Sequence, residues 1–177
     1  MMKLRLSTDE MLSQWRMRRA LEPLRSDCTV ERIDGIDLDS FLMMEMKDWY
    51  LKLLDTAPIH LLTLTDIASK VSPSKNKDLS VTIHLPQGCR RVIELALDCS
   101  PVPIKITTAD TPLALCQQNP FSRSGAVSPI AIHSHGNLTI YAGNDDFNIV
   151  KLLCVMEPDN GFYELDEAAL SLISQLP

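Results

Sequence analysis

Glycine is scarce in this chain of 177 residues, which contains only six, and none of them forms a Gly-x-Gly pair or a P-loop. A phosphate-binding loop built from consecutive glycine amides is therefore not expected. The Gly-x-Ser-x-Gly elbow that presents a nucleophilic serine is absent as well. Both absences favour a protein that is not an enzyme, and we expect it to need no cofactor.

The five cysteines indicate neither a disulfide framework nor a zinc site. Their number is odd, their spacings are long, and no Cys-x-x-Cys pair occurs. Cys89 alone has positively charged neighbours, Arg90 and Arg91, which favour a thiolate. We expect the cysteines in apolar segments to act as small hydrophobic residues in a reducing compartment.

Long hydrophobic runs are missing too, since no apolar stretch approaches the roughly 20 residues that a membrane span needs. Lys3 and Arg5 interrupt the first residues, which therefore do not resemble a secretory leader. The formal net charge is −6, and most of the acidic excess follows residue 78, which disfavours binding to phosphate backbones. We therefore expect a cytoplasmic protein with no membrane or nucleic-acid partner.

The first third of the chain is predicted to be helical. Ser7 and Glu10 have the spacing of a capping box at the start of a helix. The apolar stripe of this helix contains Trp15 and is thin, so the helix is either peripheral or completed by a partner. A stronger helix follows and ends at Pro58. Its apolar face carries Leu42, Met46, Trp49 and Leu53.

A polar segment, residues 72–77, separates this region from a β-rich remainder. Before the segment, Thr65 is positioned to cap a further short helix. After it, apolar residues alternate with polar ones, as in half-buried strands. The alternating residues are Val81, Ile83, Leu85, Ile93, Leu95, Leu97, Ile104, Ile106, Leu138 and Ile140. Asp166 is placed to cap a last short helix.

These patterns predict an α+β protein. Helices occupy residues 1–72, and residues 78–177 form an antiparallel β-sandwich or partial barrel of about six to seven strands with a short C-terminal helix. The two regions are either separate or parts of one integrated domain.

His133 and His135 are two residues apart in a predicted strand, so their rings would lie on one face of it. Such a pair is half of a Zn²⁺ site and needs one or two further ligands. The available donors are His84, Asp98 and Asp145, and no spacing links them to the pair. The alternative is two polar residues on the solvent face of a hairpin that turns at Gly136-Asn137.

The segment Gln117–Gly125 is predicted to be a long polar loop with one aromatic residue. Loops of this kind are often contacts to a partner. Phe121 and Arg123 are residue types that anchor interfaces, and with Trp15 they are the candidate interaction residues. The alternative is a mobile loop with Phe121 packed onto the core.

The order of short phrases along residues 35–175 resembles that of head–tail ring, adaptor or tail-tubular proteins of tailed bacteriophages and prophages. The phrases are Trp49-Tyr50, Leu85-Pro86, Arg90-Arg91, Pro101-Val102-Pro103 and Gln117 to Pro120, followed by an acidic-capped helix. The resemblance implies a non-enzymatic, oligomeric assembly protein with partners on both faces of a ring, located in the cytoplasm or the virion.

Three functional hypotheses therefore stand. The favoured one is a structural or assembly protein that forms homo-oligomers or binds other structural proteins. The second is a metal-binding or metal-dependent hydrolytic module at His133 and His135. The third is a β-sandwich that binds a small ligand or peptide at the Gln117–Gly125 loop.

Overall fold

The computed structural model describes residues 3–19, 38–125, 128–141, 146–158 and 161–175. The chain divides into two compact units, residues 1–63 with 157–177 and residues 64–156. The predicted α+β class is confirmed, with ten strands in three sheets among the described residues. The second unit is inserted into the sequence of the first, so the segment 72–77 falls inside the second unit and the C-terminal helix belongs to the first.

The first unit begins with strand β1 (Lys3–Ser7) and helix α1 (Thr8–Arg18). The predicted capping box is present, because the Ser7 hydroxyl accepts a hydrogen bond from the Glu10 amide and the Glu10 carboxylate accepts one from the Ser7 amide. Both otherwise unpaired backbone donors at the helix start are thus satisfied.

Helix α2 (Leu38–Thr56) carries the predicted apolar stripe, and the short 3₁₀ helix η1 (Ile59–Leu61) follows Pro58. The buried side chains of this stripe are Leu42, Met46, Tyr50, Leu53 and Leu54. Trp49 meets Trp15 of α1 edge to face, with ring centroids 5.5 Å apart. The thin stripe of α1 is therefore completed by another helix of the same chain.

The C-terminal part of this unit consists of strand β10 (Phe162–Asp166) and the 3₁₀ helix η3 (Glu167–Gln175). The predicted cap is confirmed, since Asp166 Oδ1 accepts a hydrogen bond from the Ala168 amide at 3.0 Å. β10 pairs antiparallel with β1. No strand is expected at either position from the sequence, because each finds its partner only at the opposite end of the chain.

The Tyr50 hydroxyl ties α2 to β10. It donates to the Glu164 carbonyl at 3.1 Å and accepts from the Glu164 amide at 3.0 Å. Burial raises the pKa of Tyr50 to about 12. The folded state therefore favours the neutral phenol, whose stabilising contribution is complete below pH 10 and is lost as the pH rises from 10 to about 12.

We expect Tyr50→Phe to lower the free energy of unfolding by about 1–2 kcal/mol at neutral pH, because both backbone groups lose a partner. The difference between the two proteins should shrink between pH 10 and 12, where wild-type Tyr50 ionises. Denaturant unfolding of both proteins across that pH range measures this. A difference that stays constant would contradict the role given to the hydroxyl.

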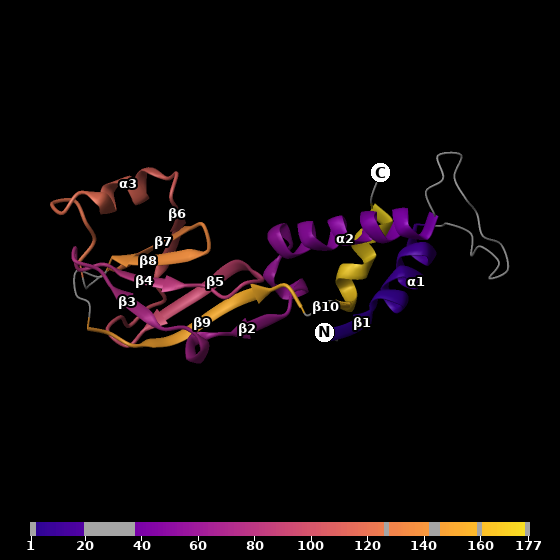
Figure 1. Cartoon of the computed structure of the whole chain (residues 1–177), viewed down its shortest axis with the longest axis horizontal. Coiled ribbons are helices and arrows are strands. Elements are labelled where there is room, and N and C mark those ends of the chain that lie inside the picture. Colours follow the sequence, from indigo (N-terminus) through magenta and orange to yellow (C-terminus); the bar gives the residue numbers. More distant parts are fainter. Residues whose placement is uncertain (1–2, 20–37, 126–127, 142–145, 159–160, 176–177) are drawn as a thin grey trace. The chain divides into compact units, whose positions relative to one another are not determined.

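The second unit is built from two sheets (Figure 1). The three-stranded sheet is antiparallel, in the order β2 (Leu64–Asp66), β9 (Ile149–Met156) and β5 (Cys89–Leu97). The five-stranded sheet has the order β3 (Pro73–Lys75), β4 (Val81–His84), β8 (Asn137–Tyr141), β7 (Ile130–Ser134) and β6 (Lys105–Thr108). All neighbouring strands in it are antiparallel except β6 and β7, which are parallel.

The two sheets share one apolar core, as the alternating pattern predicts. One sheet contributes Val81, Ile83, Ala131, Leu138 and Ile140, and the other contributes Leu95, Leu97, Leu152 and Cys154. Each of these side chains is at most 2% exposed. The arrangement is therefore a β-sandwich with a predominantly aliphatic core.

The prediction of a short helix capped by Thr65 is wrong. Thr65 lies in β2 and pairs with Cys154, and only the 3₁₀ turn η2 (Ala68–Lys70) follows. Asp66 Oδ1 accepts hydrogen bonds from the Ala68 amide and from the Leu152 amide of β9. The Asp66 carboxylate thus holds this segment against β9. A helix over the same residues would move the segment away from β9. The polar segment 72–77 likewise contains strand β3.

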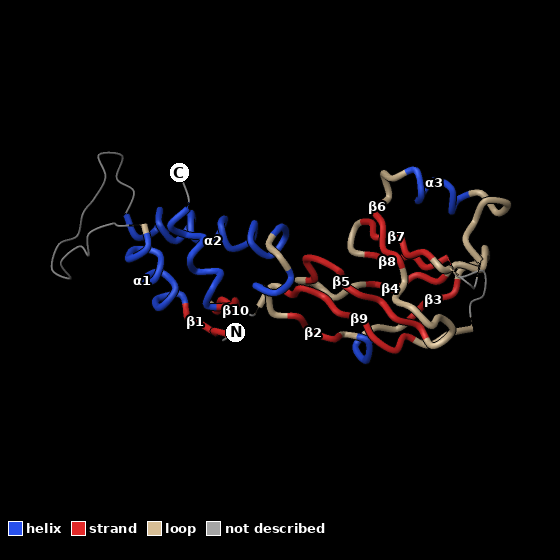
Figure 2. The backbone as a smooth tube through the Cα atoms, turned by 180° about the vertical axis from the view of Figure 1, so that it is seen from behind, coloured by secondary structure: helices blue, strands red, loops and turns tan. Residues whose placement is uncertain are grey.

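Helix α3 (Pro112–Gln118) is not predicted from the sequence, and it extends into the segment expected to be a loop. Thr111 caps it by accepting a hydrogen bond from the Ala114 amide, and Pro112 occupies its first turn. α3 lies on the side of the five-stranded sheet that faces away from the three-stranded sheet (Figures 1 and 2). Ile130 and Ile132, which alternate with the core residue Ala131, are buried on that outer face.

Among the described residues, no helix has both the length and the apolar character that crossing a lipid bilayer requires.

Candidate protein-interaction site

The predicted histidine pair lies at the β7–β8 hairpin, whose turn is shifted by one residue from the prediction. Ser134 pairs with Asn137, so the two turn residues are His135 and Gly136, with φ of 47° and 74°. Positive φ at both positions is the geometry of a type I′ turn. His133 thus lies in the strand, whereas His135 lies in the turn and is exposed.

Two of the other suggested metal ligands have hydrogen-bond partners of their own. His84 Nδ1 lies 2.7 Å from Asn137 Oδ1, and Asp98 accepts two hydrogen bonds from Asn148. Asp145 is outside the described residues. In the part of the chain that the structure describes, no three His, Cys, Asp or Glu side chains are grouped to hold a metal ion. Metal binding by the histidine pair stays a prediction.

Trp15, a candidate interaction residue, is 1% exposed and lies in the core of the first unit. Its indole Nε1 has no hydrogen-bond partner among the described residues. The ring also lines a cavity of about 600 Å³ whose wall includes Trp49 and Arg19.

The segment after α3 is an ordered turn in which internal hydrogen bonds hold the backbone. Asn119 Oδ1 accepts from the Phe121 amide at 3.0 Å, and the Asn119 carbonyl accepts from the Ser122 amide at 3.1 Å. The Ser122 hydroxyl donates to the Cys116 carbonyl at 2.7 Å. Phe121 is 100% exposed. The alternative in which its ring packs onto the core is therefore wrong.

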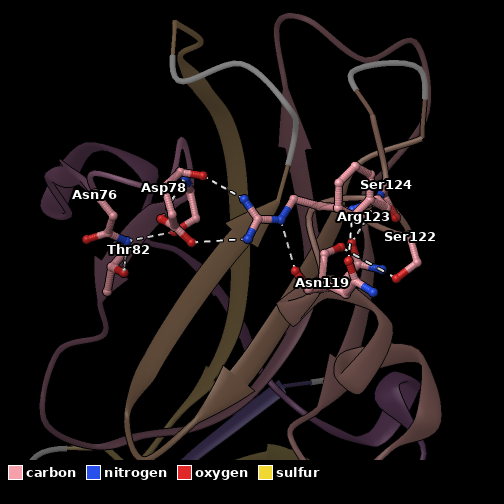
Figure 3. A network of polar contacts seen from close by, with 10 residues as sticks. Asn76, Asp78, Thr82, Asn119, Ser122, Arg123 and Ser124 are labelled. Atoms are coloured by element: carbon pink, nitrogen blue, oxygen red, sulfur yellow. Dashed lines mark hydrogen bonds and ion pairs between the residues drawn. The ribbon is translucent and has the colours of Figure 1, made fainter.

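Arg123 joins this turn to the connection between β3 and β4 (Figure 3). Its Nε donates to the Gln117 carbonyl at 2.9 Å and its Nη1 to the Asp78 carbonyl at 2.6 Å. Its Nη2 lies 3.3 Å from Asp78 Oδ2, and the guanidinium stacks over the Tyr141 ring at 5.0 Å from the centroid. The side chain is only 15% exposed. Arg123 is thus an internal anchor of the site.

Asp78 is held in its charged form. The Ser80 hydroxyl donates to Asp78 Oδ1 at 2.7 Å, and this bond above all lowers the pKa of Asp78, with a further contribution from Arg123. Asn76 Nδ2 donates to the hydroxyls of Ser80 and Thr82, both at 2.9 Å. These bonds, part of which Figure 3 shows, fix the shape of the β3–β4 connection.

Leu79 sits at the tip of this connection with φ of +61°, which is uncommon for a bulky residue. Its amide donates to the Asn76 carbonyl, and its side chain is 57% exposed. A strained backbone thus displays an apolar side chain to solvent, and strain of this kind persists only where surrounding contacts impose it.

A groove of about 460 Å³ lies between the two segments that Arg123 joins. Its lining residues are Lys77, Asp78, Leu79, Pro120, Arg123, Ser124 and Gly125. Phe121 is the next residue after Pro120, which lines this groove. The α3 surface, which we define as Phe121, Leu79 and this groove, therefore combines a protruding aromatic ring with a partly apolar hollow.

No model of a known protein family matches the chain, and no curated protein is significantly similar to it.

Proposed function

We propose that this chain is a non-enzymatic assembly protein that pairs with a second copy of itself through the α3 surface. The observation that carries the proposal is Phe121, a fully exposed aromatic side chain on a turn held by internal hydrogen bonds. A turn that is ordered before binding loses little conformational entropy on association.

A second copy is the occupant that fits the groove. The exposed ring belongs to the residue next to Pro120, which lines the hollow, so a two-fold axis would place Phe121 of each copy in the groove of the other. Leu79 and Pro120 provide apolar walls for the incoming ring. In a symmetric dimer the same patch is used by both copies, so each copy contributes one knob and one hole.

The energies favour a weak dimer. Burial of one phenylalanine side chain contributes about 1.5–3 kcal/mol, and two-fold symmetry doubles this. The cost of association, about 4–15 kcal/mol, matches or exceeds the gain from the two rings, so Leu79 and Pro120 must add buried apolar surface for even a weak dimer to form. Each copy carries a net charge of −6, so long-range repulsion opposes pairing and salt should strengthen it.

Light scattering over concentrations from about 1 µM to about 1 mM, a range in which small interfaces dissociate, tests the proposal. We expect the average mass to rise toward that of a dimer, and to rise at lower concentration when salt is added. Phe121→Ser should weaken association at least about 100-fold, because both anchors are lost.

The matched control is Val150→Ser, which removes a 61% exposed apolar side chain from strand β9 of the same unit. This variant should associate as the wild type does. A wild-type protein that stays monomeric at every concentration would refute the proposal, and so would equal weakening by both substitutions.

The resemblance to head–tail connectors of tailed phages supplies the more specific setting, and it stays a prediction. A closed ring needs a head-to-tail contact between copies, whereas a two-fold contact produces a dimer. The limiting mass at high concentration distinguishes these assemblies, because the mass of a ring would be greater than that of a dimer. A ring would support the connector setting and require a contact other than the symmetric one described here.

A further inference from the structure

Strands β1 and β10 form a two-stranded sheet whose two outer edges differ. The outer edge of β10 is covered, because the Tyr50 hydroxyl makes hydrogen bonds with both the amide and the carbonyl of Glu164. In an antiparallel pair, the amide and the carbonyl of one residue point to the same side of the strand. Those of Glu164 therefore point away from β1 and toward α2.

The register of this sheet fixes the direction of the peptide groups in β1. Arg5 lies opposite Glu164, so these two residues make no hydrogen bonds with each other, and the amide and carbonyl of Arg5 point away from β10. The same holds for Lys3, two residues earlier in the strand. Among the described residues, no hydrogen bond reaches these groups from the outer side. Ser7 ends the row, because its amide donates to the Glu10 carboxylate at 2.8 Å.

The β1 edge, which we define as the outward peptide groups of Lys3 and Arg5, carries cationic side chains. The Arg5 side chain is 57% exposed, with its guanidinium 4.4 Å from the centroid of the Phe162 ring and its Nε 3.5 Å from Glu164 Oε1. The Lys3 ammonium donates to the His60 carbonyl at 3.4 Å, an acceptor that brings no compensating charge.

These charges restrict which strand can join the β1 edge. An uncovered strand edge is a template for another strand. Like charges directly opposite each other on neighbouring strands are destabilising, whereas opposite charges are stabilising. A second copy of β1 is therefore a poor partner for this edge, and a strand that carries carboxylates is a suitable one.

We propose that the β1 edge binds an extended acidic segment of another protein, which adds to the sheet as a third strand. Lys3 and Arg5 each supply one donor and one acceptor, so an antiparallel strand exchanges a pair of hydrogen bonds with each of them. Carboxylates two residues apart in the added strand lie opposite Arg5 and Lys3 on one face. This inference does not depend on self-association through the α3 surface, which belongs to the other unit of the chain.

The experiment adds a capped peptide, Thr-Val-Glu-Thr-Glu-Val-Thr, to the full chain and measures amide hydrogen exchange by NMR. In the free protein, we expect slow exchange at Leu4 and Leu6, whose amides point toward β10, and fast exchange at Arg5. Saturation with the peptide should slow exchange at Arg5 at least about 10-fold and leave Leu4 and Leu6 little changed. The counterpart peptide with lysine in place of glutamate should bind at least about 10-fold more weakly.

Two variants of Arg5 separate the backbone from the charge. Arg5→Pro removes the outward amide and no bond to β10, and a strand edge accepts proline where the amide faces outward. Arg5→Ala is the matched control, because it removes the same charge and keeps the amide. We expect Arg5→Pro to bind the acidic peptide about 3–10-fold more weakly than Arg5→Ala does. Phe121→Ser should bind it as the wild type does, which distinguishes this test from that of self-association.

The proposal would be overturned if the acidic peptide failed to bind at about 1 mM, the weak end of specific recognition. Equal binding of the two peptides, or binding that leaves exchange at Arg5 fast, would also overturn it. Slow exchange at Arg5 in concentrated protein without peptide would show that a second copy occupies the β1 edge, which contradicts the acidic partner. The exchange measurements on the wild type decide the matter even if Arg5→Pro does not fold.

Discussion

Replacing Arg123 with methionine is expected to lower the free energy of unfolding of the sandwich by about 2 kcal/mol and to weaken self-association. The substitution removes three hydrogen bonds to Gln117 and Asp78, and a charged donor is worth about 1.5–3 kcal/mol where it is shielded from water. The contact with the Tyr141 ring changes as well, because the cation is lost. Denaturant unfolding and light scattering measure the two effects.

The control for Arg123 is its replacement by lysine, which keeps the charge and loses the planar fork of donors. One ammonium cannot reproduce the three bonds that the guanidinium makes to two segments. We therefore expect Arg123→Lys to be destabilised nearly as much as Arg123→Met. Full stability of the lysine variant would show that charge alone matters and would contradict the anchor described here.

Replacing Leu138 with alanine is expected to lower the free energy of unfolding by about 2–5 kcal/mol, the range for a leucine truncated in a close-packed core. Leu138 is 0% exposed, lies opposite Ile83 and belongs to the core that both sheets share. The loss combines the transfer of apolar atoms to water with the cavity left behind. Denaturant unfolding followed by circular dichroism measures it.

Thr139→Ala is the matched control for Leu138→Ala. Thr139 is the next residue of β8, points to the opposite face of the sheet and is only partly buried. A change within about 0.5–1 kcal/mol is expected, since no core contact is removed. Equal losses in the two variants would contradict the assignment of faces.

Elements determined by neighbouring residues could be predicted from the sequence. The capping box of Ser7 and Glu10 lies within one helical turn, and the stripe of α2 repeats at helical spacing. The alternation of Val81 and Ile83 reports which face of β4 is buried. In each case the spacing of side chains contains the structural information, so the prediction needs no distant partner.

Elements that depend on distant residues could not be predicted. β1 becomes a strand because β10 lies beside it, and β2 does so because Asp66 bonds to Leu152. Neither partner is marked in the local sequence. Helix α3 is different, because Thr111-Pro112 is a recognisable helix start, but the helix is short and the polar residues from Gln117 onward indicate a loop.

The candidate site shows the same division. Phe121 and Arg123 stand out by residue type, but the exposure of the Phe121 ring and the burial of the Arg123 side chain have no signal in the sequence. Asp78 and Leu79 could not be predicted because they are distant in the sequence from the loop that they meet. Arg123 and Asp78, for example, are 45 positions apart. The positive φ of Leu79 has no signal in the sequence.

The central claim, pairing through the α3 surface, is tested most directly by placing a photo-crosslinking benzophenone amino acid at position 121. We predict crosslinks between copies that map to residues 77–79 and 120–125 of the second molecule, and Val150→Ser should leave their yield unchanged. Crosslinks confined to one chain, or directed to another surface of the second copy, would contradict the account.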